Sequence, residues 1–313
     1  RLPTLTGTDL AWSRRNHEPR FLTLTATASR LGPGQPPQTF TLVIGVGYTG
    51  RRLLERLPAD ASAGLSRSSI DTAHRVHYFD LDSADPLPLE LPDKYSVVYT
   101  VPPAGNPDRR LSRILPLLKP APERFIYIST TGVYGDHDGA RVTETTPVNP
   151  QNERSARRVA AERQLSHWAL GNACQLVVLR APGIYGPGRL GIERIEAGLP
   201  VLDEQSANPG NRIHVDDLVQ CCVAGLSDEV PAGICNVGDG DHRSSHWFSN
   251  EIARQLELPA PPEISMAEAR QQFSPQRLSF MSESRIVDTQ RMRDVLGVTP
   301  RYADPEDGIR ASL

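Results

Sequence analysis

The feature that most constrains the fold is a glycine turn that lies between an apolar run and a helical pattern. Residues 39–45 form the apolar run, residues 45–50 read Gly-Val-Gly-Tyr-Thr-Gly, and residues 51–57 follow with helical spacing. A strand, a glycine turn and a helix in this order are typical of the opening of a βαβ unit. The sequence therefore predicts that the chain begins its folded part with such a unit.

Each glycine of this turn has its own expected role. Gly45 permits the tight turn, Gly47 lets the backbone approach a pyrophosphate, and Gly50 allows the helix to pack closely on the strand. Free N–H groups at the start of the helix, at Tyr48 and Thr49, would hold the pyrophosphate. We expect these five residues to bind a dinucleotide; the alternative is a glycine turn without a ligand.

Strand and helix patterns alternate along the first part of the chain. Further apolar runs that predict strands lie at 62–66, 76–79, 96–101, 124–129 and 175–179. Helical patterns lie at 108–118 and at 152–170, and the second ends at Gly171-Asn172, a candidate left-handed cap. Such alternation favours an α/β fold, a Rossmann-type doubly wound parallel sheet with helices on both faces.

The pattern of the sequence changes after residue 180, where proline and glycine repeatedly interrupt the predicted helices and strands. We expect a Rossmann domain at 39–180 that returns near 211–238, and a smaller C-terminal substrate-binding lobe formed by 181–210 and 239–313. Within 239–313 one helix is predicted, near 246–257. Residues 1–38, rich in Thr, Ser and Arg, are interpreted as an N-terminal extension.

Composition excludes several classes of partner. The net charge is −3 and no segment concentrates basic residues, which argues against nucleic acid. No apolar run reaches about 18 residues, so no membrane partner is expected. The four cysteines form no CxxC pair, which favours reduced thiols and a cytoplasmic protein. His242 and His246 are four residues apart, but a third ligand is lacking and no metal site is expected.

The end of the second predicted strand indicates which cofactor binds. An NAD enzyme places Asp or Glu about 20 residues after the glycine turn, where it binds the ribose 2′-hydroxyl. Residues 61–70 contain no acid and instead include Ser66 and Arg67. A hydroxyl beside a guanidinium suits a 2′-phosphate, so the sequence favours NADP over NAD. The alternative interpretation of Arg67 is an exposed loop arginine.

Several motifs together resemble the extended short-chain dehydrogenase/reductases, the NAD-dependent epimerase/dehydratase family. They are IGVGYTG (44–50), FDLD (79–82), ISTTGVYG (128–135), RAPGIYGPGR (180–189), RIHVDDL (212–218) and NVGDGD (236–241). The resemblance implies that Asp80 and Leu81 contact the adenine, and that Val101 and Pro102 run beside the nicotinamide ribose. It also implies that Thr130 holds a substrate oxygen, and that the helices near 108–118 and 152–170 form a homodimer.

The chain departs from this family at its Tyr-xxx-Lys pair, which exchanges a proton with the substrate. Alignment on the Asn-Pro at 149–150 and on the later Ala-Ala-Glu places Arg154 at the tyrosine position and Arg158 at the lysine position. A guanidinium does not deprotonate at working pH, so Arg154 cannot act as a general acid or base. Thr130, Arg154 and Arg158 are the catalytic candidates, the two arginines as sources of positive charge.

Other residues could replace the lost tyrosine as the proton carrier. Tyr134 and Tyr185 lie in loops that the resemblance places near the cleft, although structural roles are favoured for both. Glu144 and Glu153 are close to the lost tyrosine in sequence, and a raised pKa could make either an acid. The competing interpretation is solvated acids at the start of a helix.

Two functional hypotheses follow. In the first, the chain is an NAD(P)-dependent oxidoreductase or epimerase that acts on a small-molecule substrate such as a nucleotide sugar. In the second, it is a catalytically silent NADP(H)-binding regulator or redox sensor. The intact glycine turn supports both hypotheses, and the missing tyrosine separates them.

Overall fold

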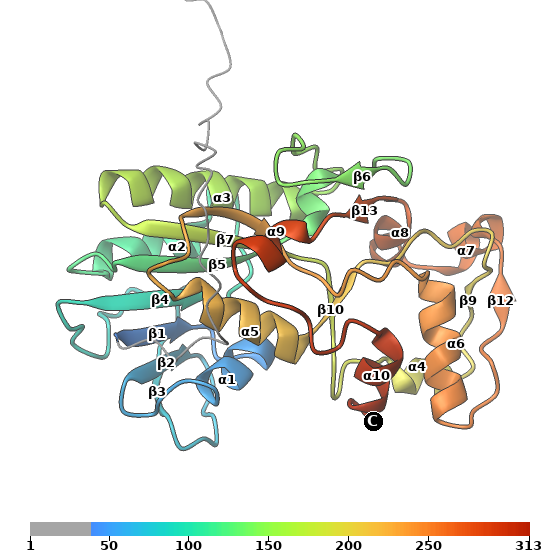
Figure 1. Ribbon diagram of the computed structural model, residues 1–313, viewed down its shortest axis with the longest axis horizontal. Helices are drawn as coiled ribbons and strands as arrows, with labels where there is room; N and C mark the ends of the chain where they lie inside the picture. Colours follow the sequence, from blue (N-terminus) through green and yellow to red (C-terminus); the bar gives the residue numbers. More distant parts are fainter. Residues whose placement is uncertain (1–38) are drawn as a thin grey trace, which may run out of the picture.

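The computed structural model describes residues 39–313. The predicted N-terminal extension, 1–38, lies outside the described residues. A parallel sheet of seven strands forms the centre of the molecule, in the order β11-β7-β5-β4-β1-β2-β3 (Figure 1). Its strands are β1 (Phe40–Ile44), β2 (Ser62–Ser66), β3 (Arg75–Tyr78), β4 (Tyr95–Tyr99), β5 (Arg124–Thr130), β7 (Gln175–Ala181) and β11 (Gly233–Asn236).

Helices cover both faces of this sheet, which is why its inner strands are buried along almost their whole length and are mostly apolar. On one face Val43 and Val98 pack in a core with Leu53 and Leu218 of the helices α1 (Tyr48–Leu54) and α5 (Val215–Gly225). On the other face Tyr99 packs in a second core with residues of α2 (Arg109–Ile114) and α3 (Glu153–Gly171). The predicted fold class, a Rossmann-type doubly wound α/β fold, is confirmed.

A second group of elements lies beyond the carboxyl ends of the strands, at the right of Figure 1. Three short parallel pairs occur outside the central sheet: β8 (Gly183–Tyr185) with β10 (Arg212–His214), β9 (Val201–Leu202) with β12 (Glu263–Ile264), and β6 (Arg141–Val142) with β13 (Ile286–Val287). The remaining α-helices are α4 (Ile192–Glu196), α6 (Ser245–Gln255), α7 (Met266–Gln272), α8 (Pro275–Met281), α9 (Gln290–Asp294) and α10 (Pro305–Arg310), and two short 3₁₀ helices are η1 (Leu115–Leu117) and η2 (Thr131–Tyr134).

The last 75 residues contain more helix than the sequence predicts. The predicted helix near 246–257 corresponds to α6, but α7, α8, α9 and α10 were not anticipated, because each is only five to seven residues long. Helices this short contain too few residues to show a clear apolar repeat. At α9 the chain returns to the sheet, where Met292 of this helix and the following Leu296 and Val298 join the same core as Val177. The expected lobe at 239–313 is therefore divided between two parts of the molecule, and the proposed domain boundaries remain a prediction.

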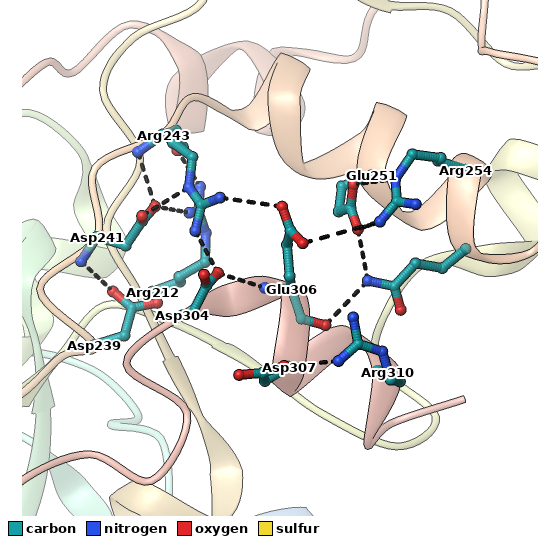
Figure 2. A network of polar contacts seen from close by, with 11 residues as sticks. Arg212, Asp239, Asp241, Arg243, Glu251, Arg254, Asp304, Glu306, Asp307 and Arg310 are labelled. Carbon is teal, nitrogen blue, oxygen red and sulfur yellow. Dashed lines mark hydrogen bonds and ion pairs between the residues drawn. The ribbon is translucent and has the colours of Figure 1, made fainter.

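A polar network connects the second group of elements (Figure 2). Arg212 of β10 pairs with Asp241 at 3.1 Å, and Asp241 pairs in turn with Arg243 at 2.7 Å. Arg243 reaches Asp304 at the N-terminus of α10 at 2.6 Å. Gln255 of α6 donates a hydrogen bond to the backbone carbonyl of Glu306 at 3.0 Å. The network therefore joins β10, the loop that follows β11, α6 and α10.

The end of α3 differs from the predicted left-handed cap at Gly171-Asn172. The cap residue Asn172 has φ −119°, and Ala173 carries the positive φ of 52°. The amide of Asn172 bonds to the carbonyl of Ala169, and its side-chain amide donates to the carbonyl of Trp168. These two bonds keep Asn172 out of the left-handed region, and the reversal of the chain moves to the next residue.

Candidate dinucleotide site

The three glycines of the turn have three different surroundings. Gly45 has φ 98°, and a Cβ there would come within 2.6 Å of the Val101 Cγ2 atom. A Cβ at Gly50 would overlap the carbonyl oxygen of Gly45. Gly47 has no atom within 4 Å of the position of a Cβ, so the backbone there is open to a ligand. Two glycines thus serve the fold, and Gly47 faces open space.

Helix α1 begins directly at this turn. Gly47 is its N-cap and provides no side-chain cap, so the amides of Tyr48, Thr49 and Gly50 have no partner within the helix. The amide of Arg51 is the first to bond within α1, to the carbonyl of Gly47 at 2.9 Å. Uncapped amides at the start of a helix favour an anion.

A cavity of about 520 Å³ opens beside the turn. It lies at the carboxyl ends of β1, β2 and β4, where the strand order of the sheet reverses between β1 and β4. In open α/β sheets this switch point is where ligands bind. The cavity is lined by predicted cofactor residues: Gly45, Gly47, Ser66, Arg67, Leu81, Val101 and Pro102.

Four predicted cofactor residues do not line this cavity. Tyr48, Thr49 and Gly50 form the first turn of α1. The carboxylate of Asp80 turns back to accept a hydrogen bond from the amide of Asp82 at 3.0 Å. The structure thus brings most of the predicted cofactor residues to one cavity and places these four beside it.

Other lining residues were missed by the sequence reasoning. The hydroxyl of Thr100, directly after β4, donates to the carbonyl of Gly45 at 2.6 Å and fastens the turn to that strand. Phe79 and Arg110 also line the cavity. Thr100 precedes the predicted residue Val101 and Phe79 precedes the predicted residue Asp80, so their places in the sequence could have indicated that they line the site. Arg110 lies in α2, away from the predicted residues in sequence, and no sequence signal indicated it.

The candidate Thr130 ends β5 at the same edge of the sheet. Its hydroxyl oxygen accepts a hydrogen bond from the amide of Gly132 at 3.2 Å and caps the 3₁₀ helix η2. The neighbouring Ser129 is buried and donates to Glu162 of α3 at 2.5 Å. Glu162 also pairs with Arg180 of β7 at 2.7 Å, with both side chains buried. The strand end that carries Thr130 is therefore held firmly against α3.

The two arginines at the tyrosine and lysine positions differ in their contacts. Arg158 donates to the carbonyl of Ile128 at 2.8 Å and to the Tyr127 hydroxyl at 3.1 Å, which brings its charge to the end of β5. Arg154 lies near Glu283, which follows α8; burial lowers the pKa of Arg154, and the charge of Glu283 opposes that shift. Arg158 therefore faces the sheet, whereas Arg154 faces the C-terminal part of the chain.

Comparisons with known proteins agree with this arrangement. Residues 111–238 match the model of the NAD dependent epimerase/dehydratase family. A solved structure of a functionally unknown conserved protein from Silicibacter pomeroyi DSS is 30% identical, with a TM-score of 0.74, over 87% of this chain and 98% of that one. The chain belongs to the NAD-dependent epimerase/dehydratase family.

Other similar proteins are more distant in sequence. The structure of MoeE5 in complex with UDP-glucose and NAD is 21% identical with a TM-score of 0.70, over 87% of this chain and 97% of that one, and shows a shared fold. The human dTDP-D-glucose 4,6-dehydratase is 23% identical over 43% of this chain and 41% of that protein. An uncharacterized protein of Sinorhizobium fredii, y4nG, is 23% identical over 59% of this chain. The chain spans 51% of the length of the Sinorhizobium fredii protein and 41% of the length of the human dehydratase.

For a member of this family, the hydroxyls that could replace the lost tyrosine are poorly placed. The Tyr134 hydroxyl is fully buried and donates to the Asn236 side chain at 2.7 Å. Tyr185 is 3% exposed, and burial raises its pKa far above the ordinary value. Both rings are enclosed by the protein, and both hydroxyls are buried.

The two candidate carboxylates are also engaged. Glu144 accepts a hydrogen bond from the amide of Asn236 at 2.8 Å, and burial raises its pKa. Glu153 is 80% exposed and pairs with Arg157 one turn later in α3. Glu144 thus caps the end of β11, and Glu153 is a solvated acid at the start of a helix.

The two histidines four residues apart, His242 and His246, bind different partners. His246 pairs with Glu263 at 2.8 Å, and His242 contacts the carbonyl of Gly210 at 3.1 Å. Between residues 39 and 313 no group of three or more His, Cys, Asp or Glu side chains is arranged to hold a metal ion. No helix of this part of the chain combines the length and apolar character that a membrane crossing requires.

Proposed function

We propose that this chain binds NADP(H) at the glycine turn and transfers hydride to or from a nucleotide-linked polyol. The cavity of about 520 Å³ carries this proposal, because it joins the turn, the end of β2 and the end of β4 at the switch point of the sheet. The bound dinucleotide would supply the hydride or accept it. The residues of the chain bind it, orient the substrate and stabilise charge.

The residues of the turn fit a dinucleotide. The open space at Gly47 admits a pyrophosphate to within contact of the backbone, and the uncapped amides of α1 would donate to it. Val101 and Pro102 would run beside the nicotinamide ribose, and Asp80 and Leu81 would contact the adenine. These four roles come from the family resemblance.

The preference for NADP over NAD rests on the end of β2. Ser66 and Arg67 line the cavity there, and residues 61–70 contain no acid that could bind a ribose 2′-hydroxyl. The name of the MoeE5 structure specifies NAD. This chain would differ in cofactor because a guanidinium suits a 2′-phosphate through charge-assisted hydrogen bonds.

The substrate class follows from the relatives. Their names specify dTDP-glucose, UDP-glucose and UDP-arabinose. Thr130 would accept or donate a hydrogen bond at the reacting hydroxyl. Arg158, anchored on β5 through one terminal nitrogen, would supply positive charge with its other N–H groups, and Arg154 would add to that charge.

The second candidate function is a catalytically silent NADP(H)-binding regulator or redox sensor. Two observations favour it: Tyr134 and Tyr185 are buried, and both lysines lie away from the site. Lys94 precedes β4 and pairs with Glu123 at 3.4 Å, at the amino ends of the strands, and Lys119 precedes β5 in the chain. Both lie at the edge of the sheet opposite the cavity.

Turnover separates the two functions. The full chain is incubated with NADPH and a panel of nucleotide sugars and 4-keto nucleotide sugars, and NADPH absorbance is followed. We expect substrate-dependent oxidation that is lost in the double variant Arg154→Tyr/Arg158→Lys. General acid–base assistance is worth about 10²–10⁴ in rate, so a restored relay would instead raise the rate visibly.

Three results decide between the hypotheses, with thermal unfolding and NADPH titration of both proteins as controls. A higher rate in the variant would show that Arg154 and Arg158 are not the catalytic groups. Binding of NADPH by both proteins with no turnover of any panel member would establish the silent binder. Absence of NADPH binding by the folded unmodified chain would contradict both.

We further infer a cytoplasmic protein that forms a homodimer and takes a small-molecule substrate. All four cysteines are buried free thiols, which suits a reducing compartment. The dimer contact would involve α2 and α3, as the resemblance implies.

A further inference from the structure

Three arginines gather around one carboxylate at the rim of the cavity. Asp82, which follows β3, is met by Arg110 through two of its nitrogens, the closer at 2.6 Å. Arg109 reaches the same carboxylate at 3.1 Å and Arg67 at 3.9 Å. Arg67 comes from the end of β2, and the other two begin α2. Segments that are far apart in sequence therefore meet at Asp82.

The charges of this group do not balance. Among the residues that the structure describes, Asp82 is the one carboxylate within ion-pair distance of these guanidinium groups, so two positive charges remain uncompensated. The hydrogen bonds from Arg110 hold the pKa of Asp82 below its ordinary value, so the carboxylate stays ionised at neutral pH. A phosphate monoester carries a charge of about −1.5 to −2 at pH 7, which matches this excess.

The positions of the three arginines differ. Arg110 is 18% exposed, lines the cavity, and also donates to the carbonyl of Pro102 at 3.3 Å. Arg67 lines the cavity and is 62% exposed, while Arg109 is 71% exposed and lies outside the lining. A bidentate pair fixes Arg110 in place, because both partners are held in one plane. Arg110 is therefore preorganised, and Arg67 is free to adjust.

We propose that Arg110, positioned by Asp82, acts with Arg67 as a ligand for a phosphate on the ribose 2′-oxygen of a bound adenine dinucleotide. This inference rests on the dinucleotide site proposed above and names the residues that select its cofactor. Ser66 and Ser68, which line the same wall of the cavity, supply hydroxyl groups beside the arginines. Arg109 contributes charge from outside the cavity, and Asp82 is a positioning residue that does not itself contact the phosphate.

The test compares two probes that differ only in this phosphate, 2′-phospho-ADP-ribose and ADP-ribose. Neither carries nicotinamide, so the measurement is independent of turnover. In calorimetric titrations of the full chain, we expect the phosphorylated probe to bind at least about tenfold tighter. Arg110→Ala should remove most of that ratio and leave the affinity for ADP-ribose within about twofold. The ratio should also fall as KCl is raised.

Two further variants keep the test decisive. Arg113→Ala is the matched control, since Arg113 lies on the same helix but donates to the carbonyls of Ser83 and Asp85 and does not line the cavity. Its ratio should equal that of the unmodified chain. Arg109→Ala changes an exposed side chain, so the variant should fold, and we expect a smaller loss of about two- to threefold.

The outcomes are distinguishable from failure of the dinucleotide site. Equal binding of both probes to the unmodified chain would overturn this inference and leave the site standing. An unchanged ratio in Arg110→Ala would also overturn it, as would an equal loss of both probes, which indicates a structural role. Binding of neither probe to the unmodified chain would overturn the dinucleotide site itself.

Discussion

At the scale of single residues, the glycine turn shows how one residue type serves two purposes. Gly45 and Gly50 are required by the fold, because a Cβ at either would meet atoms of the turn or of the residues after β4. Gly47 has negative φ, −90°, and open space where a Cβ would stand. Its lack of a side chain therefore has no explanation in packing, and under the proposed function it lets the dinucleotide approach the backbone.

Because of this difference, the substitution Gly47→Val tests ligand binding without disturbing the packing of the turn. We expect the variant to keep its fold and lose dinucleotide binding, because the new side chain projects into the space that the pyrophosphate would occupy. NADPH titration checks the binding, and thermal unfolding provides the control: the midpoint should stay within a few degrees of the unmodified chain, about 4 °C. A folded variant that still binds NADPH would place the ligand elsewhere.

At the scale of elements, α3 is attached to the sheet by a buried ion pair. Glu162 of α3 and Arg180 of β7 are 9% and 4% exposed, and Ser129 of β5 donates to the same carboxylate. A charge left without its partner in such a place is costly, because it has lost its water. The pair joins three elements that surround Thr130.

Removing the charge of Glu162 should therefore destabilise the fold. We expect Glu162→Gln to lower the free energy of unfolding by about 3–5 kcal/mol, since the Arg180 charge stays buried. Glu153→Gln in the same helix is the matched control: Glu153 is 80% exposed, and its loss should change the free energy by less than about 1 kcal/mol. Urea denaturation measures both, and equal small effects would show that water reaches Arg180.

At the scale of the whole molecule, the polar network of Figure 2 contains one carboxyl with an unusual titration. Asp239 is 3% exposed, and burial raises its pKa to about 7, although the charge of Arg212 opposes the shift. Asp241 and Asp217 raise it further. Asp239 follows the last strand of the sheet and lies at the junction with β10, α6 and α10.

The raised pKa gives stability a definite dependence on pH. In the unfolded chain an aspartate titrates near 3.9, so between about pH 4 and pH 7 the folded state holds a proton that the unfolded state has released. The free energy of unfolding therefore falls as pH rises through this window. Above it Asp239 is ionised in both states, so its destabilising effect is complete and no longer changes with pH. Asp239→Asn removes this dependence. Denaturation at pH 5 and pH 7.5 should show the variant gaining about 2–3 kcal/mol relative to the unmodified chain; a constant difference would contradict the shift.

Much of this architecture can be predicted from the sequence because its signals are local. The run before Gly45 and the apolar segments at 62–66 and 124–129 coincide with β1, β2 and β5 within one or two residues. Strands buried on both faces are mostly apolar, and a glycine turn is recognisable within six residues. The fold class followed from these signals, and so did the predicted roles of Gly45, Gly47, Ser66 and Arg67. The roles predicted for Leu81, Val101 and Pro102 came from the family resemblance.

The contacts that decide the chemistry could not be predicted in this way. Arg110 meets Asp82 across 28 residues, and Arg154 lies near Glu283 across more than a hundred, because the loops between these residues follow paths that no short pattern specifies. The helices after residue 265 escaped prediction because each spans two turns or fewer. The sequence by itself determined the doubly wound sheet and its glycine turn, since backbone preference and periodic burial act within a few residues. Only the tertiary structure decided which charged side chains meet at the rim of the cavity and which hydroxyl groups are buried. Both depend on where segments distant in sequence come together.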